Sequence, residues 1–135
     1  MKPQIKWAEF IFPSTLLLAP ITKELLEPIR MKERLDRLEL GLQEALVNAA
    51  KHGNSLDSTK KLRVRRIITP NWYIWQIQDQ GPGIPEEKRL CDLPSKIESE
   101  NGRGLFLIHQ CFDDVRWSQR GNRIQLGFRR VSGPC

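Results

Sequence analysis

One segment with helical periodicity, residues 32–54, constrains the fold more than any other part of the chain. Its sequence is "KERLDRLELGLQEALVNAAKHGN", and apolar residues recur in it every three or four positions. The recurring residues are Leu35, Leu38, Leu42, Leu46 and Ala49. This spacing gathers apolar side chains on one face of a helix, and that face has to be buried against another element. The pattern therefore predicts a long amphipathic helix that ends near Gly53, since glycine commonly terminates helices.

Runs rich in β-branched and aromatic residues predict the sheet against which this helix packs. The expected strands are "QIKWAEFIFPS" (4–14), "KLRVRRIIT" (61–69), "WYIWQIQDQ" (72–80), "VRWSQ" (115–119) and "RIQLGFRR" (123–130). The second and third of these runs form one predicted hairpin, and the last two form another.

Two further helices are expected. One lies in "LLLAPITKELLEPIRM" (16–31), with Ser14 or Thr15 as its cap and its prolines near the ends. The other resumes helical spacing from Leu105, after a long polar loop. Strands and helices are grouped rather than strictly alternating. We therefore predict an α+β fold, a two-layer sandwich with a mixed, mostly antiparallel sheet and helices on one face.

Composition narrows the class of protein. The chain has 135 residues, 39% hydrophobic and 28% charged, which suits a single domain spanning 1–135. No apolar run reaches the roughly 20 residues that cross a bilayer. Three cysteines without metal-ligand spacing indicate a reduced, cytoplasmic protein.

The net charge of +6 favours an anionic partner, which can be nucleic acid, nucleotide phosphate or an acidic protein. Basic residues gather in "KKLRVRR" (60–66) and "FRR" (128–130). Because both clusters alternate with other residues, they favour strands with one solvated face over a nucleic-acid surface.

A polar stripe interrupts the long helix. Glu44, Asn48 and His52 are spaced by four residues and therefore share one helix face. Small neighbours such as Ala45 and Ala49 let another group lie close to that stripe. A solvated surface stripe is the simpler alternative, and the helix by itself does not exclude it.

Two glycine-containing motifs follow the stripe along the chain. In "DQGPGIP" (79–85), Asp79 ends a strand, and its carboxylate can accept a hydrogen bond from an exocyclic amine. Gly81 and Gly83 permit positive φ and close approach of the backbone to a ligand. Ordinary turns have a similar composition, so this motif is weak when taken singly.

The second motif, "NGRGLFLI" (101–108), predicts a glycine-rich turn that opens a helix. Free amides and the positive end of the helix dipole would then form a phosphate site, to which Arg103 adds a permanent charge. The alternative is a plain glycine helix start, which does not account for two glycines that flank an arginine.

Together, the order and spacing of the three motifs resemble those of the GHKL ATPase superfamily. DNA gyrase, a heat-shock chaperone, histidine kinases and a DNA mismatch-repair protein share its Bergerat fold. "EALVNAAKHGN" resembles the N box of that superfamily, "DQGPGIP" its first glycine box and "NGRGLFLI" its second. The resemblance covers roughly residues 5–130. Within the superfamily, the pattern is most similar to that of bacterial anti-sigma-factor serine/threonine kinases of partner-switching systems.

The resemblance implies ATP and Mg²⁺ as cofactors, and it implies a role for each motif residue. Glu44 would be the general base, and Asn48 would coordinate the metal. Asp79 would bind the adenine amine, and residues 86–101 would form a lid over the phosphates. The remaining implied nucleotide-site residues are Lys51, Gly81, Gly83, Ile84, Gly102, Arg103, Gly104 and Leu105. In many relatives a threonine near the start of the last strand helps to hold adenine, and the matching region here is "GNRIQL", with Asn122 and Arg123.

The resemblance also implies partners. The substrate would be a serine on a small antagonist protein, with a sigma factor as a further target and a homodimer as the assembly. Neither nucleic acid nor a membrane is an expected direct partner. Two alternatives stay open, namely a nucleotide-gated protein-binding module without useful phosphoryl transfer and a basic nucleic-acid-binding domain. The latter leaves the order of the motifs unexplained.

Overall fold

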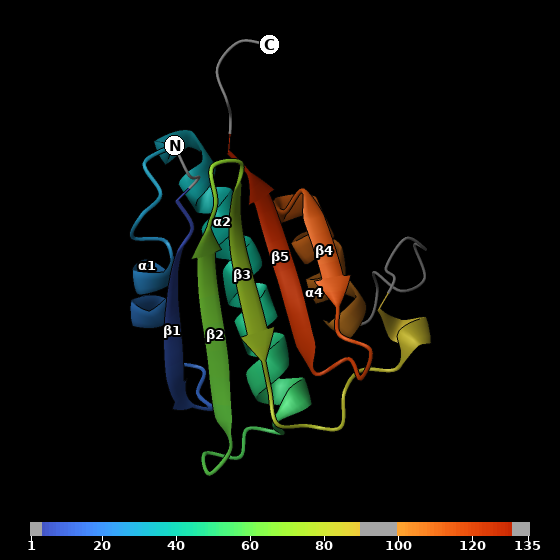
Figure 1. Cartoon of the computed structure of the whole chain (residues 1–135). Coiled ribbons are helices and arrows are strands. Elements are labelled where there is room, and N and C mark those ends of the chain that lie inside the picture. Colours follow the sequence, from blue (N-terminus) through green and yellow to red (C-terminus); the bar gives the residue numbers. More distant parts are fainter. Residues whose placement is uncertain (1–3, 90–99, 131–135) are drawn as a thin grey trace.

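A five-stranded antiparallel sheet with helices on one face forms the protein (Figure 1). The computed structural model describes residues 4–89 and 100–130. The strands are β1 (Lys6–Pro13), β2 (Lys61–Ile68), β3 (Trp72–Gln78), β4 (Asp114–Trp117) and β5 (Arg123–Arg129). The α-helices are α1 (Ala19–Leu25), α2 (Lys32–Val47) and α4 (Glu100–Cys111). A π-helical turn, η1 (Asn48–Gly53), extends α2, and a 3₁₀ turn, η2 (Glu86–Lys88), follows β3. This arrangement confirms the predicted α+β class.

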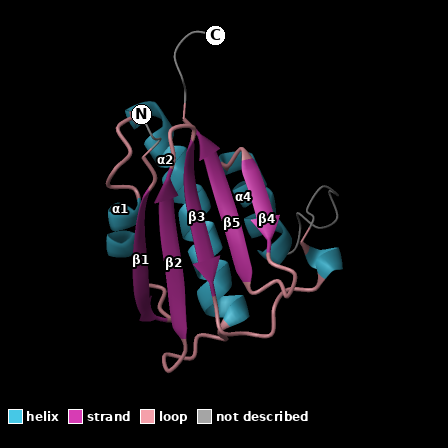
Figure 2. Cartoon of the chain, in the orientation of Figure 1, coloured by secondary structure: helices cyan, strands magenta, loops and turns pink. Residues whose placement is uncertain are grey.

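The strand order is β1-β2-β3-β5-β4, so β5 returns to pair with β3 after the chain has passed through α4 and β4. Figure 2 shows the helices behind the sheet and no element in front of it among the described residues. Inward-facing side chains of the central strands and the apolar stripe of α2 form the core. Its fully enclosed members include Leu38, Leu42, Leu46, Leu62, Val64, Trp75 and Leu126. Alternation in the strands and helical spacing in α2 therefore meet in one apolar layer.

Helices α2 and α4 pack closely because a glycine removes the side chain at their contact. A Cβ added at Gly41 would lie 2.6 Å from both Cys111 Cβ and Phe112 Cε2, closer than non-bonded carbon atoms can approach. Phe112 in turn packs edge-on against Trp75 of the sheet, with ring centroids 6.0 Å apart. The α2–α4 pair is thereby fixed over the centre of the sheet.

The prediction of a cap at Ser14 or Thr15 is wrong. Helix α1 begins at Ala19, with Leu18 as its N-cap residue and no side-chain cap. The Ser14 hydroxyl instead donates to the Lys60 carbonyl at 3.1 Å and accepts from Asn54 Nδ2 at 2.7 Å. Ser14 therefore satisfies polar groups buried where the end of β1 meets the β2 side of the fold.

Helix α4 starts earlier than the apolar periodicity predicts. It begins at Glu100 rather than near Leu105, so the expected glycine-rich turn is part of the helix. Gly104, which precedes the first apolar position, lies against the polar side chains of Glu44 and Asn48. Residues 90–99, which make up most of the predicted lid, lie outside the described residues. In the described part of the chain, no helix combines the length and the apolar character needed to cross a membrane.

Candidate functional site

The polar stripe of Glu44, Asn48 and His52 lies where α2 changes from an α-helix to the π-helical turn η1. Glu44 lies in the last turn of α2, and Asn48 begins the π-helical turn η1. Both side chains are half-buried, whereas His52 is exposed. π-helical turns are rare and frequently occur at functional sites. The stripe is therefore partly enclosed by protein, unlike an ordinary solvated helix face.

The group that lies against this stripe is the start of α4. A Cβ added at Gly104 would lie 3.3 Å from Glu44 Oε2 and 3.4 Å from both side-chain polar atoms of Asn48. Gly104 is itself buried. The structure thus brings together the N-box-like and second glycine motifs, more than 50 residues apart in the sequence. A side chain at this position would fit only tightly, with small shifts of the Glu44 and Asn48 side chains.

The first glycine motif meets the same helical segment further toward the C-terminus, at the end of η1. A Cβ added at Gly53 would overlap the Asp79 carboxylate, and one added at Gly81 would overlap the Gly53 carbonyl oxygen. Gly81 has no positive φ, so its glycine character is explained by this contact with η1. Two glycines are therefore required for the end of η1 and the exit of β3 to touch.

Asp79 is held in a fixed position at this junction. Its amide donates to the Asn122 carbonyl at 2.9 Å, and its Oδ1 accepts from the Gly81 amide at 2.8 Å. Burial raises the pKa of the Asp79 carboxyl, while the bond from Gly81 and the charges of Lys60 and Arg120 act in the opposite direction. The carboxylate is thus partly desolvated and already oriented, as expected of an acceptor that recognises a ligand donor.

Asn122 lies in the region where the family resemblance leads us to expect a threonine. Besides accepting from Asp79, it directs its side-chain amide toward the Asp79 carbonyl at 3.4 Å. The structure thus assigns Asn122 to the same end of the site as Asp79.

Sequence reasoning missed Asn54, which follows directly after the helix terminator. Its side chain has no exposed surface. Asn54 Oδ1 accepts from the Gln80 amide at 2.7 Å, and Asn54 Nδ2 donates to Ser14 Oγ and, at 3.0 Å, to the Lys61 carbonyl. Because Asn54 joins η1 to the segment that follows β3, it helps to fix the position of the neighbouring Asp79 carboxylate. An asparagine after the helix-ending glycine was the only indication of this in the sequence.

A second missed feature joins the first glycine motif to the β4–β5 turn. Gly83 has φ +93° and Gly121 has φ +84°, and a Cβ on either would meet backbone of the opposite turn. The Ile84 amide donates to the Gly121 carbonyl at 3.0 Å. Arg89 closes the junction, because its Nε donates to the Ile84 carbonyl at 2.9 Å and its Nη2 to the Gln119 carbonyl at 3.0 Å.

The other predicted site residues have varied positions. Lys51 is half-buried in η1, and Arg103 is exposed near the start of α4. Gly102 lies in the first turn of α4. Leu105 is a core residue that is 4% exposed, so it anchors the helix beneath the site. Within residues 4–89 and 100–130, no three acidic, histidine or cysteine side chains form a cluster that could hold a metal.

The fold is an antiparallel sheet with helices on one face, and the N-box-like helix contacts two glycine motifs. This combination defines a nucleotide-binding domain of the Bergerat type. A family model described as a histidine kinase-like ATPase domain matches residues 21–128, and the chain belongs to this family. No curated protein sequence matches the chain.

The residues present fit the cofactors of this family. Glycines 53, 81 and 104 leave no side chain where three segments meet, and Asp79 offers an oriented acceptor. Asn48 offers the amide oxygen that a hard cation prefers, and Mg²⁺ commonly uses few protein ligands together with phosphate oxygens. These residues therefore suit ATP, and Asn48 is the side chain that would hold Mg²⁺.

Proposed function

We propose that the protein is an ATP-dependent serine/threonine protein kinase that regulates a partner protein in the manner of an anti-sigma factor. The observation that carries this proposal is the position of Glu44, whose carboxylate lies beside Asn48 and against Gly104. A serine hydroxyl is a weak nucleophile and needs a base, whereas a histidine acceptor is already nucleophilic. A carboxylate one helical turn from a metal-binding amide suits phosphoryl transfer to serine.

Each residue has a defined task in this proposal. Glu44 accepts the proton of the attacking hydroxyl. Asn48 would hold Mg²⁺, and the bound ion would supply positive charge next to the transferred phosphoryl group. Asp79 accepts a hydrogen bond from the adenine amine, and its bond from Gly81 keeps the carboxylate oriented for that purpose. Lys51 and Arg103 supply positive charge for the phosphates.

The proposed substrate is a small antagonist protein carrying the serine. Phosphorylation of that antagonist would decide whether the kinase binds it or a second target, for which a sigma factor is the proposed candidate. The proposed location is the cytoplasm, and the proposed assembly is a homodimer.

A transfer assay with matched variants tests the kinase proposal. The protein is incubated with radiolabelled Mg-ATP and an extract of its own cells, and labelled phosphoserine is quantified. Glu44→Gln is expected to reduce transfer at least about 100-fold, because general base catalysis typically contributes that much. ATP affinity from calorimetry is expected to change little. Glu39→Gln, on an exposed turn of the same helix, is the matched control and is expected to behave as the unaltered protein.

Two results would contradict the proposal in different ways. ATP binding without any labelled serine would make the protein a nucleotide-gated binding module. Equal transfer by the Glu44→Gln variant would remove Glu44 as the base while leaving the nucleotide site intact.

A further inference from the structure

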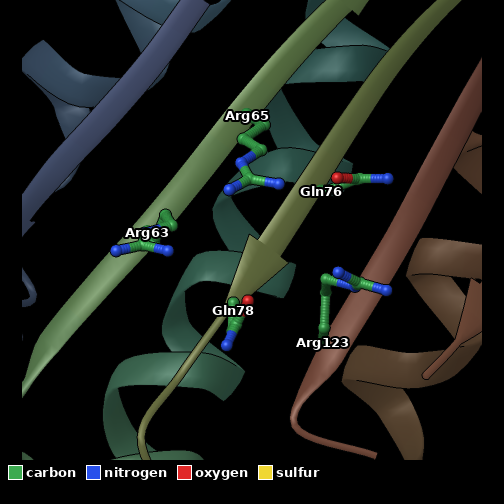
Figure 3. Close-up of a pocket in the computed structure, with 5 residues that line it drawn as sticks. All are labelled: Arg63, Arg65, Gln76, Gln78 and Arg123. Carbon is green, nitrogen blue, oxygen red and sulfur yellow. The ribbon is translucent and has the colours of Figure 1, made fainter. Parts of the chain in front are cut away.

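The face of the sheet opposite the helices carries a shallow depression made of arginine and glutamine side chains (Figure 3). Its lining residues are Arg63 and Arg65 of β2, Gln76 and Gln78 of β3, and Arg123 of β5. We call this set the arginine–glutamine face. Glu44, Asn48 and Gly104 lie in the helical layer, so the arginine–glutamine face is separate from the nucleotide site.

Strand register arranges these side chains in two rows. Arg63, Gln78 and Arg123 are direct neighbours across three strands, and Arg65, Gln76 and Gln125 form the next row. Neighbouring strands are about 4.8 Å apart, so the backbones at Arg63 and Arg123 are separated by about 10 Å. Gln76 Nε2 donates to Gln125 Oε1 at 2.8 Å, which steadies the middle of the second row.

The charge of this face is not balanced within it. Glu9 alone faces two guanidinium groups, with its carboxylate 3.2 Å from Arg63 Nε and 3.4 Å from Arg65 Nε. For Arg123, no ion-pair partner exists in the part of the chain that the structure describes. Guanidinium groups bind carboxylates in a bidentate manner, which makes a carboxylate-bearing partner the electrostatic complement.

We propose that the arginine–glutamine face binds an acidic segment of a partner protein, with carboxylates about 10 Å apart that engage Arg63 and Arg123. That separation corresponds to seven residues of an α-helix at about 1.5 Å per residue. Glutamine amides between the arginines can donate and accept, so they suit the polar backbone or side chains of such a segment. The surface does not depend on phosphoryl transfer, and it gives the protein a second place to hold a partner.

Neighbouring residues favour a protein over other occupants. Trp7 and Ile11 on the adjacent edge strand are 66% and 52% exposed, and exposed aromatic and aliphatic groups beside arginines are typical of protein interfaces. Single-stranded nucleic acid stacks successive bases on several aromatic faces, whereas Arg129 lies over the Trp72 ring at 5.6 Å and leaves Trp7 as the open aromatic side chain among the described residues of this face. A second copy of the chain would set arginines against arginines.

The test is a heteronuclear NMR titration of the full chain at physiological salt. The first probe is a synthetic helical peptide with glutamates on one face, seven residues apart. The second has the same composition with the glutamates distributed around the helix, and the third is a thymidine oligonucleotide. The first peptide is expected to shift amide resonances of β2, β3 and β5, and to bind more tightly than its isomer.

Arginine variants identify the surface. Arg63→Gln combined with Arg123→Gln is expected to weaken binding of the first peptide about tenfold, since two charge-assisted contacts are lost. Arg30→Gln with Arg37→Gln removes the same charge outside this face and is expected to change affinity less than twofold. ATP binding by both double variants is expected to be unchanged, which shows that they are folded and separates this proposal from the kinase proposal.

Four outcomes would overturn the inference. These are no binding of the first peptide, equal loss in both double variants, tighter binding of the oligonucleotide through the same arginines, and concentration-dependent self-association that these arginine substitutions abolish.

Discussion

Two glycine contacts on the helix side of the molecule differ in how tightly they are built. At the adenine end proposed for the site, Gly81 is so close to Gly53 that an added Cβ would overlap the Gly53 carbonyl oxygen. At the phosphate end, a Cβ on Gly104 would lie 3.3–3.4 Å from Glu44 and Asn48, which is tight but sterically attainable. The first contact joins backbone to backbone, and the second brings backbone close to polar side chains.

The difference indicates that the stability of the fold depends on glycine more strongly at Gly81 than at Gly104. Backbone cannot yield without disturbing η1 and β3, so the contact at the adenine end is part of the fold itself. Side chains can turn, so the contact at the phosphate end leaves the fold less dependent on glycine. Substitutions at the two ends should therefore separate stability from nucleotide binding.

Gly81→Ala is expected to have the largest effect on stability, and it tests the difference between the Gly81 and Gly104 contacts most directly. The added methyl group would force η1 away from β3, and overpacking of this kind typically costs about 1–3 kcal/mol. We expect a lower urea midpoint, with an unfolding free energy reduced by about 2–3 kcal/mol, and loss of ATP binding as Asp79 is displaced. A stability loss no greater than that of Gly104→Ala would contradict the distinction between the two ends.

Asp79→Asn tests the proposed adenine contact while keeping the size and shape of the side chain. The asparagine oxygen can still accept from the Gly81 amide, but the other side-chain atom becomes a donor facing the adenine amine. Hydrogen bonds to charged groups contribute about 1.5–3 kcal/mol, so ATP affinity in calorimetry should fall about 10- to 100-fold. Unaltered affinity would exclude Asp79 as the adenine acceptor. The matched control is Asp57→Asn on an exposed loop, which should bind ATP normally.

Acidification provides a graded form of the same test. Burial raises the pKa of Asp79, so the carboxylate protonates at a higher pH than an ordinary aspartate does. Adenosine affinity should decline as pH falls through this raised pKa, and Asp79→Asn should lack the decline.

The pH dependence of the unfolding free energy has the opposite sign to that of adenosine affinity. The contribution of Asp79 is largest below its unfolded pKa and is lost as pH rises through the folded value, so Asp79→Asn should be at least as stable at neutral pH. A parallel decline in adenosine affinity in both proteins would contradict this assignment.

The smallest expected effect on stability is that of Gly104→Ala. Alanine favours a helix by about 1 kcal/mol over glycine, which offsets the tight contact with Glu44 and Asn48. The unfolding free energy should therefore change by less than about 1 kcal/mol. Phosphate-dependent affinity should weaken, which is measured as a smaller difference between the dissociation constants of ATP and adenosine. A loss of several kcal/mol in stability would show that the phosphate end is as rigid as the adenine end.

Regular elements followed from local patterns. Periodic leucines predicted α2, and alternation predicted the strands and both hairpins. Burying one face requires an apolar residue at every second position of a strand and at every third or fourth position of a helix. The same rules failed at Ser14 and at the start of α4. Ser14 bonds to distant residues instead of capping a helix, and Gly104 in the first part of α4 lies against distant polar side chains, so neither position follows from local periodicity.

The amino-acid sequence alone determined which residue types could serve a nucleotide, since carboxylates, amides and glycines recur at family spacing in three segments. Only the tertiary structure decided why particular glycines are needed and that Asn54, Asn122 and Arg89 join those segments. It also decided that the arginines of separate strands form one charged face. The physical reason is that steric exclusion and charge act through space, between residues whose separation along the chain carries no information about their distance.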